Sequence, residues 1–148
     1  MLQKLSKNRG GFTLVEIMIV VAIIALLAAI AVPNFLRARK RSQATRILED
    51  LRLIDSAIDQ YAIENNKHTQ DMVTWSDVQK YLKQGSTLYS SNATDLLGNM
   101  YDDGEWYIDT DWGAPHVPWE TYWDLEDVAP EEFWGKYAPY GLGPLMVQ

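Results

Sequence analysis

Residues 17–36 read IMIVVAIIALLAAIAVPNFL and contain no charged side chain. A helix of about twenty residues rises about 30 Å, which matches the thickness of the hydrocarbon core of a bilayer. Isoleucine, valine, leucine and alanine occupy all sides of this helix, so it has no polar face of the kind found on surface helices. We therefore expect an apolar environment, such as a membrane, around the whole segment.

Three interpretations of this segment compete. A secretory signal peptide agrees with the basic leader and with the small residues of Ala29-Ile30-Ala31, but the apolar run exceeds the usual ~7 to 15 residues. A permanent signal anchor leaves Glu16 unexplained, because a carboxylate at the edge of the hydrocarbon is costly. In the third interpretation the leader is removed and the helix assembles with copies of itself.

The stretch Gly10-Gly11-Phe12-Thr13-Leu14-Val15-Glu16 supports the third interpretation. It resembles the cleavage and methylation motif of type IV pilins and type II secretion pseudopilins, and the resemblance extends from about Lys4 to Arg41. It implies that a prepilin peptidase cuts between Gly11 and Phe12 on the cytoplasmic side of the bacterial inner membrane and that Phe12 is N-methylated. The remaining head would then lie in the periplasm.

The chemistry of this motif is consistent residue by residue. Gly11 lets an extended backbone enter a protease cleft that a side chain would obstruct, and the cut creates an amine on Phe12. That amine can pair with Glu16, and a pair between staggered neighbouring helices would fix their axial register. Methylation leaves the amine basic. The alternative, in which Glu16 merely lies near the lipid headgroups, stays open.

Pro33 lies near the end of the apolar run, and it removes one helical hydrogen bond. We expect a helix kink at Pro33, and the pilins that this chain resembles have a proline at the matching place.

A second helical pattern continues over residues 37–66. Apolar residues recur at intervals of three and four, which predicts an amphipathic helix that packs on the protein's own head; they are Ile47, Leu51, Ile54, Ile58 and Tyr61. A coiled-coil dimer is the alternative. The basic residues Arg37, Arg39, Lys40, Arg41 and Arg46 indicate contact with anionic headgroups. A net charge of -7 argues against nucleic acid as a partner.

Residues 67–148 are expected to form one globular head without disulfides, since the chain has no cysteine. The capping box Thr74-Trp75-Ser76-Asp77 predicts a short helix. Residues 87–89, 100–101 and 105–109 read as short strands with a tight turn at Asp102-Asp103-Gly104, and Pro130 begins a last short helix. The fold class is therefore α+β, a long N-terminal helix packed on a small antiparallel sheet.

The segment from Asp95 to Tyr101 indicates which members of the family this chain resembles most. It is similar to an aspartate, proline, tryptophan, glycine, asparagine, x, tyrosine segment of major pseudopilins, with leucines in the proline and tryptophan places. The resemblance implies a structural subunit of a type II secretion pseudopilus. Its partners would be prepilin peptidase, copies of itself, other pilin-like subunits and an inner-membrane assembly platform. A type IV pilin is the alternative.

Five of the six tryptophans lie between residues 106 and 134, among many acidic residues. The tryptophans could form the core of the head, or a carbohydrate-binding face as in an adhesin-like minor pilin. Calcium is a possible ligand, although no cofactor is required; its candidate oxygen ligands are Asp102, Asp103, Asp109 and Asp111. Enzyme chemistry is not predicted, because the chain has only two histidines, no cysteine and no phosphate-binding loop.

Overall fold

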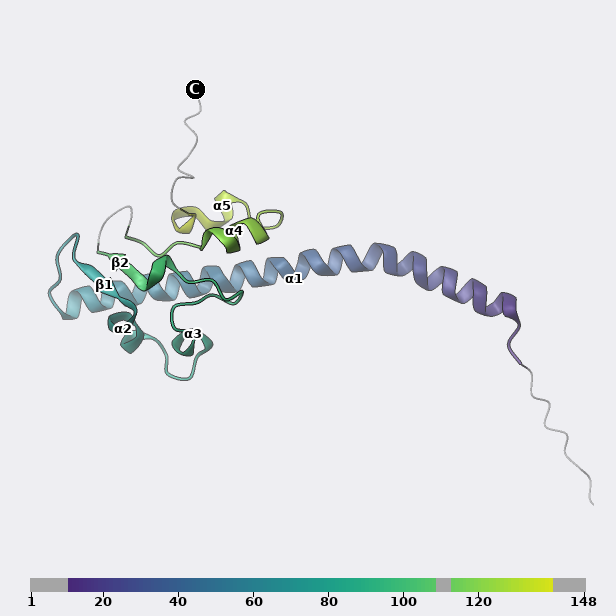
Figure 1. Ribbon diagram of the computed structural model, residues 1–148, viewed down its shortest axis with the longest axis horizontal. Helices are drawn as coiled ribbons and strands as arrows, with labels where there is room; N and C mark the ends of the chain where they lie inside the picture. The colour runs from purple at the N-terminus through teal and green to yellow at the C-terminus, as the bar shows by residue number, and fades with distance from the viewer. Residues whose placement is uncertain (1–10, 109–112, 140–148) are drawn as a thin grey trace, which may run out of the picture. The chain divides into compact units, whose positions relative to one another are not determined.

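The computed structural model describes residues 11–108 and 113–139, in two compact units that we treat separately (Figure 1). The first unit comprises Met1–Arg37 and the second Ala38–Gln148. One helix, α1 (Leu14–Glu64), contributes to both units. Its continuity confirms the long N-terminal helix expected from the sequence, and it ends at Glu64.

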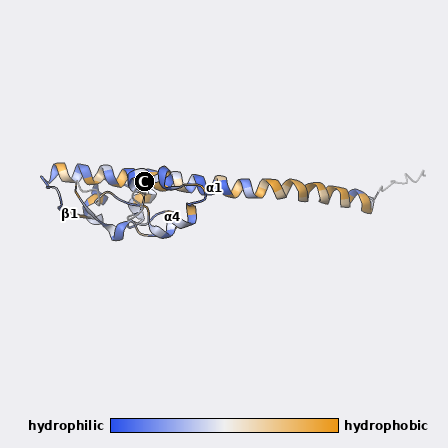
Figure 2. Ribbon diagram, turned by 90° about the horizontal axis from the view of Figure 1, so that it is seen from above, coloured by the Kyte–Doolittle hydropathy of each residue, from blue (hydrophilic) through white to orange (hydrophobic). Residues whose placement is uncertain are grey.

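The first unit consists of the apolar half of α1. Every residue from 11 to 39 is exposed in the isolated chain, and Figure 2 shows this half as an almost continuous hydrophobic ribbon. Among the described residues, α1 is long and apolar enough to cross a membrane by length and composition. Pro33 lies inside the helix, which continues on both sides of it, and a kink there stays a prediction.

The second unit is built on the other half of α1. The predicted stripe forms its buried face, since Ile47, Leu51, Ile54 and Ile58 are buried and Tyr61 is half-buried. Ala44, Leu48 and Ala57 widen this face. The same residues belong to the hydrophobic core of the head, so the helix packs on its own domain as the sequence predicted.

The sheet of the head has two antiparallel strands, β1 (Met72–Thr74) and β2 (Glu105–Tyr107). Val73 lies opposite Trp106, and both side chains are buried. The α+β class and the strand beginning at Glu105 are confirmed. The pairing was not predicted, because β1 precedes β2 by about thirty residues of loops and short helices.

Two of the predicted strands are wrong. Residues 87–89 lie in a helix, α3 (Thr87–Ser90), because the Ser86 side chain caps it by accepting a hydrogen bond from the Tyr89 amide at 3.1 Å. Met100 forms only an isolated bridge with Thr94 and does not pair with β2.

The predicted tight turn is present as η2 (Asp102–Gly104), which leads into β2. Its three residues have φ angles of 42°, 54° and 74°, so the turn has a left-handed backbone conformation. Asp109, the expected end of that strand, lies outside the described residues.

The remaining short helices surround the core. The capping box begins α2 (Trp75–Val78), where the Thr74 amide donates to the Asp77 carboxylate at 3.2 Å, and η1 (Gln79–Tyr81) follows. The helix after Pro130 is α5 (Glu131–Trp134), followed by η3 (Gly135–Tyr137). These two helix starts confirm the predictions, whereas α4 (Trp119–Leu125) was not predicted.

The tryptophans divide into two groups. Trp75, Trp106 and Trp134 are buried, and the Trp134 indole donates to the Ala129 carbonyl at 2.8 Å. Trp119 and Trp123 are exposed, so the interpretation of the tryptophans as core holds for only part of the set. Trp112 lies outside the described residues.

Candidate assembly site

The start of α1 is fixed by Glu16. One oxygen of its carboxylate accepts hydrogen bonds from the Thr13 amide at 2.8 Å and from the Thr13 hydroxyl at 2.9 Å. In return the Glu16 amide donates to the Thr13 hydroxyl at 3.2 Å. This reciprocal arrangement is a capping box, which ties the first turn of the helix to the residue before it. This capping role of Glu16 was not predicted, although the spacing Thr-x-x-Glu is its signature.

Gly11 and Phe12 lie immediately before this cap. Neither belongs to the helix, and the Phe12 side chain is 82% exposed. A Cβ atom added at Gly11 would meet nothing within 4 Å. The peptide bond between them is therefore free of helical hydrogen bonding and open to a protease. Cleavage would create the Phe12 amine one residue before Thr13, whose amide donates to the Glu16 carboxylate.

A second set of hydrogen bonds lies in the head, in residues 95–101, the segment that resembles major pseudopilins. Asp95 is buried, and one oxygen of its carboxylate accepts from the amides of Leu97 at 2.8 Å and Asn99 at 2.9 Å. The other oxygen accepts from the hydroxyl of Thr121 on α4. Gly98 has a φ of 96°, a left-handed conformation that favours glycine.

Four residues of this segment match the pseudopilin pattern, and they are the ones that hold it in place: Asp95, Gly98, Asn99 and Tyr101. The Asn99 side chain donates to the Thr121 hydroxyl at 2.9 Å, and Tyr101 is fully buried. Leu96, which stands in the proline place of the resemblance, is 51% exposed. The hydrogen bonds of Asp95 and Asn99 therefore hold this turn against α4, and we call them the clamp.

Replacing Asp95 with alanine is expected to destabilise the head. The change removes three acceptor contacts, from the buried Thr121 hydroxyl and from the half-buried amides of Leu97 and Asn99. An unpaired donor costs about 1–3 kcal/mol when it is fully buried, so the Thr121 contact should contribute most. The tryptophans all lie in the head, so urea unfolding of the detergent-solubilised full chain, followed by tryptophan fluorescence, reports its stability. Leu96→Ala is the matched control in the same turn, and equal midpoints for the two variants would contradict the clamp.

Stability should also depend on Asp50, a half-buried residue of α1. Burial raises the pKa of Asp50; Arg46 opposes the rise, while Glu49 and Asp95 add to it. The folded state therefore binds this proton more tightly than the unfolded chain. The resulting stability is present below the unfolded pKa and is lost as the pH rises through the folded one.

Asp50→Asn is thus expected to raise the urea midpoint at pH 7, because it removes a charge that burial disfavours. The gain should shrink as the pH falls through the raised folded-state pKa of Asp50, because the native carboxyl is then protonated and uncharged as well. Glu105→Gln, the same change at an exposed position, is the control. A gain that persists unchanged at low pH would contradict this explanation.

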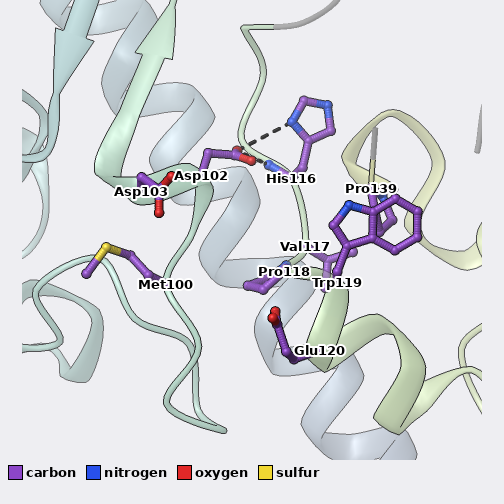
Figure 3. Close-up of a pocket in the computed structure, with 9 residues that line it drawn as sticks. All are labelled: Met100, Asp102, Asp103, His116, Val117, Pro118, Trp119, Glu120 and Pro139. Carbon is purple, nitrogen blue, oxygen red and sulfur yellow. Dashed lines mark hydrogen bonds and ion pairs between the residues drawn. The ribbon is translucent and has the colours of Figure 1, made fainter. Parts of the chain in front are cut away.

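The structure describes two of the four expected calcium ligands, Asp102 and Asp103. Asp102 accepts from the His116 amide at 2.6 Å, and the same oxygen lies 3.4 Å from the His116 ring nitrogen Nδ1, as Figure 3 shows. Asp103 is exposed, and Asp109 and Asp111 lie outside the described residues. In the part of the chain that the structure describes, no group of three or more histidine or acidic side chains could hold a metal ion. Calcium binding therefore stays a prediction.

The chain is similar to a family model and to several known proteins. The model of a family described as the prokaryotic N-terminal methylation motif matches residues 6–32. The type II secretion system core protein G of Klebsiella pneumoniae is 34% identical over 139 residues, which cover 93% of this chain and 86% of that protein.

Two pilus proteins are also similar. The type IV wide pilus major component of Thermus thermophilus is 45% identical over 65 residues, or 44% of this chain. The type IV major fimbrial protein of Dichelobacter nodosus is 36% identical over 84 residues, or 57% of this chain. The chain spans only about half the length of these two relatives, at 50% and 52%. No solved structure matches it significantly.

Proposed function

We propose, because the chain belongs to the family of type II secretion system core protein G, that it is a structural subunit of a type II secretion pseudopilus. One observation carries the choice between pseudopilus and pilus. The similarity to core protein G extends over 93% of the chain and so includes the head, whereas the two pilus proteins match at most 57% of it.

In this proposal a prepilin peptidase removes residues 1–11 by cutting between Gly11 and Phe12, and Phe12 is then N-methylated. Residues 12–36 cross the bacterial inner membrane and later form the core of the filament. Their exposed apolar side chains support this step, because they can exchange contact with lipid for contact with neighbouring copies. Residues 37–66 join the filament core to the head of residues 67–148, which lies in the periplasm.

Glu16 has two successive tasks in this proposal. In the precursor it caps α1 through Thr13. After cleavage its charge pairs with the methylated amine of Phe12 on a neighbouring subunit, which sets the stagger between helices. The partners are prepilin peptidase, copies of the same chain, other pilin-like subunits and an inner-membrane assembly platform. No catalysis is proposed for the chain itself.

The test is complementation. A bacterium whose own core protein G has been deleted should regain secretion when this protein is produced in place of it, and overproduction should give filaments that contain it. Surface pili without restored secretion would favour the second candidate, a type IV pilin, which the 45% identity to a pilus component supports. Binding of the protein to a glycan array without filaments would instead indicate an adhesin.

A further inference from the structure

We infer that the solvent face of α4 binds the arginines at the base of the head of a second copy of this chain. We call Trp119, Glu120, Trp123 and Asp124 the α4 face, and Arg37, Arg39 and Arg41 the arginine segment. This inference rests on the proposed filament, since it names a contact between its subunits.

The α4 face carries two large apolar side chains in solvent. Trp119 is 40% exposed and Trp123 is 58% exposed. Their rings stack on each other, with centroids 5.9 Å apart and planes at 25°. The other side of the helix, Thr121 and Leu125, is buried. An exposed aromatic cluster on a small domain is characteristic of a surface that another molecule covers.

The charge of this face selects the kind of partner. Glu120 and Asp124 are both exposed and lie four residues apart, a spacing at which like charges repel on a helix. Beyond Asp95 the only lysine or arginine is Lys136, and it pairs with Asp55 at 2.5 Å. The α4 face therefore has no cation from its own end of the chain, and a cationic partner would relieve the repulsion.

The arginine segment has the complementary properties. All three arginines are exposed, and none forms an ion pair with a residue that the structure describes. Lys40, between them, pairs with Asp127 near the end of α4 at 2.9 Å. A guanidinium stacks on an indole and pairs with a carboxylate at the same time, so it fits a face that alternates tryptophan and acid.

The spacing of the two sets also agrees. Arg37 and Arg41 are four positions apart in α1, and so are Glu120 and Asp124 in α4. Each pair therefore spans about 6 Å along its helix, and two arginines of one copy can meet two carboxylates of another in register.

Other ligands fit the exposed tryptophans and acids of the α4 face less well. A glycan would stack on the indoles and donate hydrogen bonds to the carboxylates, but a neutral sugar would not relieve the repulsion between Glu120 and Asp124. The cavity beside Trp119 and Glu120, shown in Figure 3, measures about 170 Å³, below the several hundred Å³ usual for small-molecule sites. Anionic lipid would be repelled by Glu120 and Asp124. A second copy is favoured further because a filament holds subunits at high effective concentration.

Cross-linking between copies tests the contact, and the absence of native cysteine makes it clean. An Arg41→Cys chain and a differently tagged Trp123→Cys chain are produced together, and isolated filaments are treated with a short bis-maleimide. Because each chain has one cysteine, a product that carries both tags joins two copies. We expect this product with Trp123→Cys plus Arg41→Cys, and not with Trp123→Cys plus the control Lys67→Cys.

A charge exchange provides the second measurement. Arg39→Glu with Arg41→Glu, or Glu120→Arg with Asp124→Arg, should each reduce the number of filaments about tenfold, equivalent to about 1.4 kcal/mol. Producing both variants in one cell should restore filaments. Filaments without the cross-link or without this rescue would overturn the α4 contact and leave the proposed function standing. If the unmodified protein forms no filaments, the proposed function fails and the contact with it.

Discussion

Gly11→Val is expected to leave the protein in its uncut form. The scissile bond follows Gly11, and a branched Cβ would block the extended backbone from entering the peptidase cleft. The effect should fall on cleavage and not on folding, because Gly11 lies outside α1 and a Cβ there meets nothing within 4 Å. Immunoblots and intact mass of membrane fractions would show the precursor alone, without filaments.

Gly10→Ala is the control for this variant. It makes a small change one residue further from the bond and is expected to leave cleavage intact. Normal processing of Gly11→Val would show that the leader is not removed at this glycine, and the prediction of a prepilin cut at Gly11 would then be wrong.

Glu16→Ala is expected to insert into the membrane and to be cut, but to assemble poorly. The ion pair between Glu16 and the amine of Phe12 would form in a low-dielectric setting, and removing one partner there leaves an uncompensated charge. We expect the number of filaments to fall on the order of a hundredfold, counted by electron microscopy at equal protein level.

The capping box makes a sharper control available. Glu16→Gln keeps an oxygen that can accept from the Thr13 amide, so it preserves the start of α1 while removing the charge. If the charge matters, Glu16→Gln should fail in assembly much as Glu16→Ala does. Normal filaments from Glu16→Gln would reduce the role of Glu16 to helix capping.

The long helix and its two halves could be predicted from the sequence because their signals are local. An uncharged run specifies the first half, and the spacing from Ile47 to Tyr61 specifies the buried face of the second. Thr74 and Pro130 mark helix starts for the same reason, since a cap or a proline acts on its own neighbours.

The sheet could not be predicted in the same way. The pairing of Val73 with Trp106 joins residues that are distant in the chain, and no local pattern selects it. Residues 87–89 contain leucine and tyrosine and read as a strand, but one hydrogen bond to Ser86 was enough to begin a helix.

The candidate sites also could be predicted only where their residues are close together in the sequence. Gly11, Phe12 and Glu16 form a contiguous motif, so their expected chemistry could be proposed from the sequence. The clamp at Asp95 depends on Thr121, which is distant in the chain and on a helix that was not predicted. Composition could not distinguish the buried Trp106 from the exposed Trp123, because burial depends on which side of its own element each residue lies and not on residue type. Trp106 is on the buried side of β2, and Trp123 is on the solvent side of α4.

The most direct test of the proposed processing is the intact mass and N-terminal sequence of the protein recovered from membranes or filaments. The mature chain should lack residues 1–11 and begin with N-methylated Phe12. A chain that begins at Val32 would indicate a signal peptide, and one that retains Met1 would indicate a permanent anchor. Either result would contradict the assignment of this helix as a cleaved, self-assembling filament core.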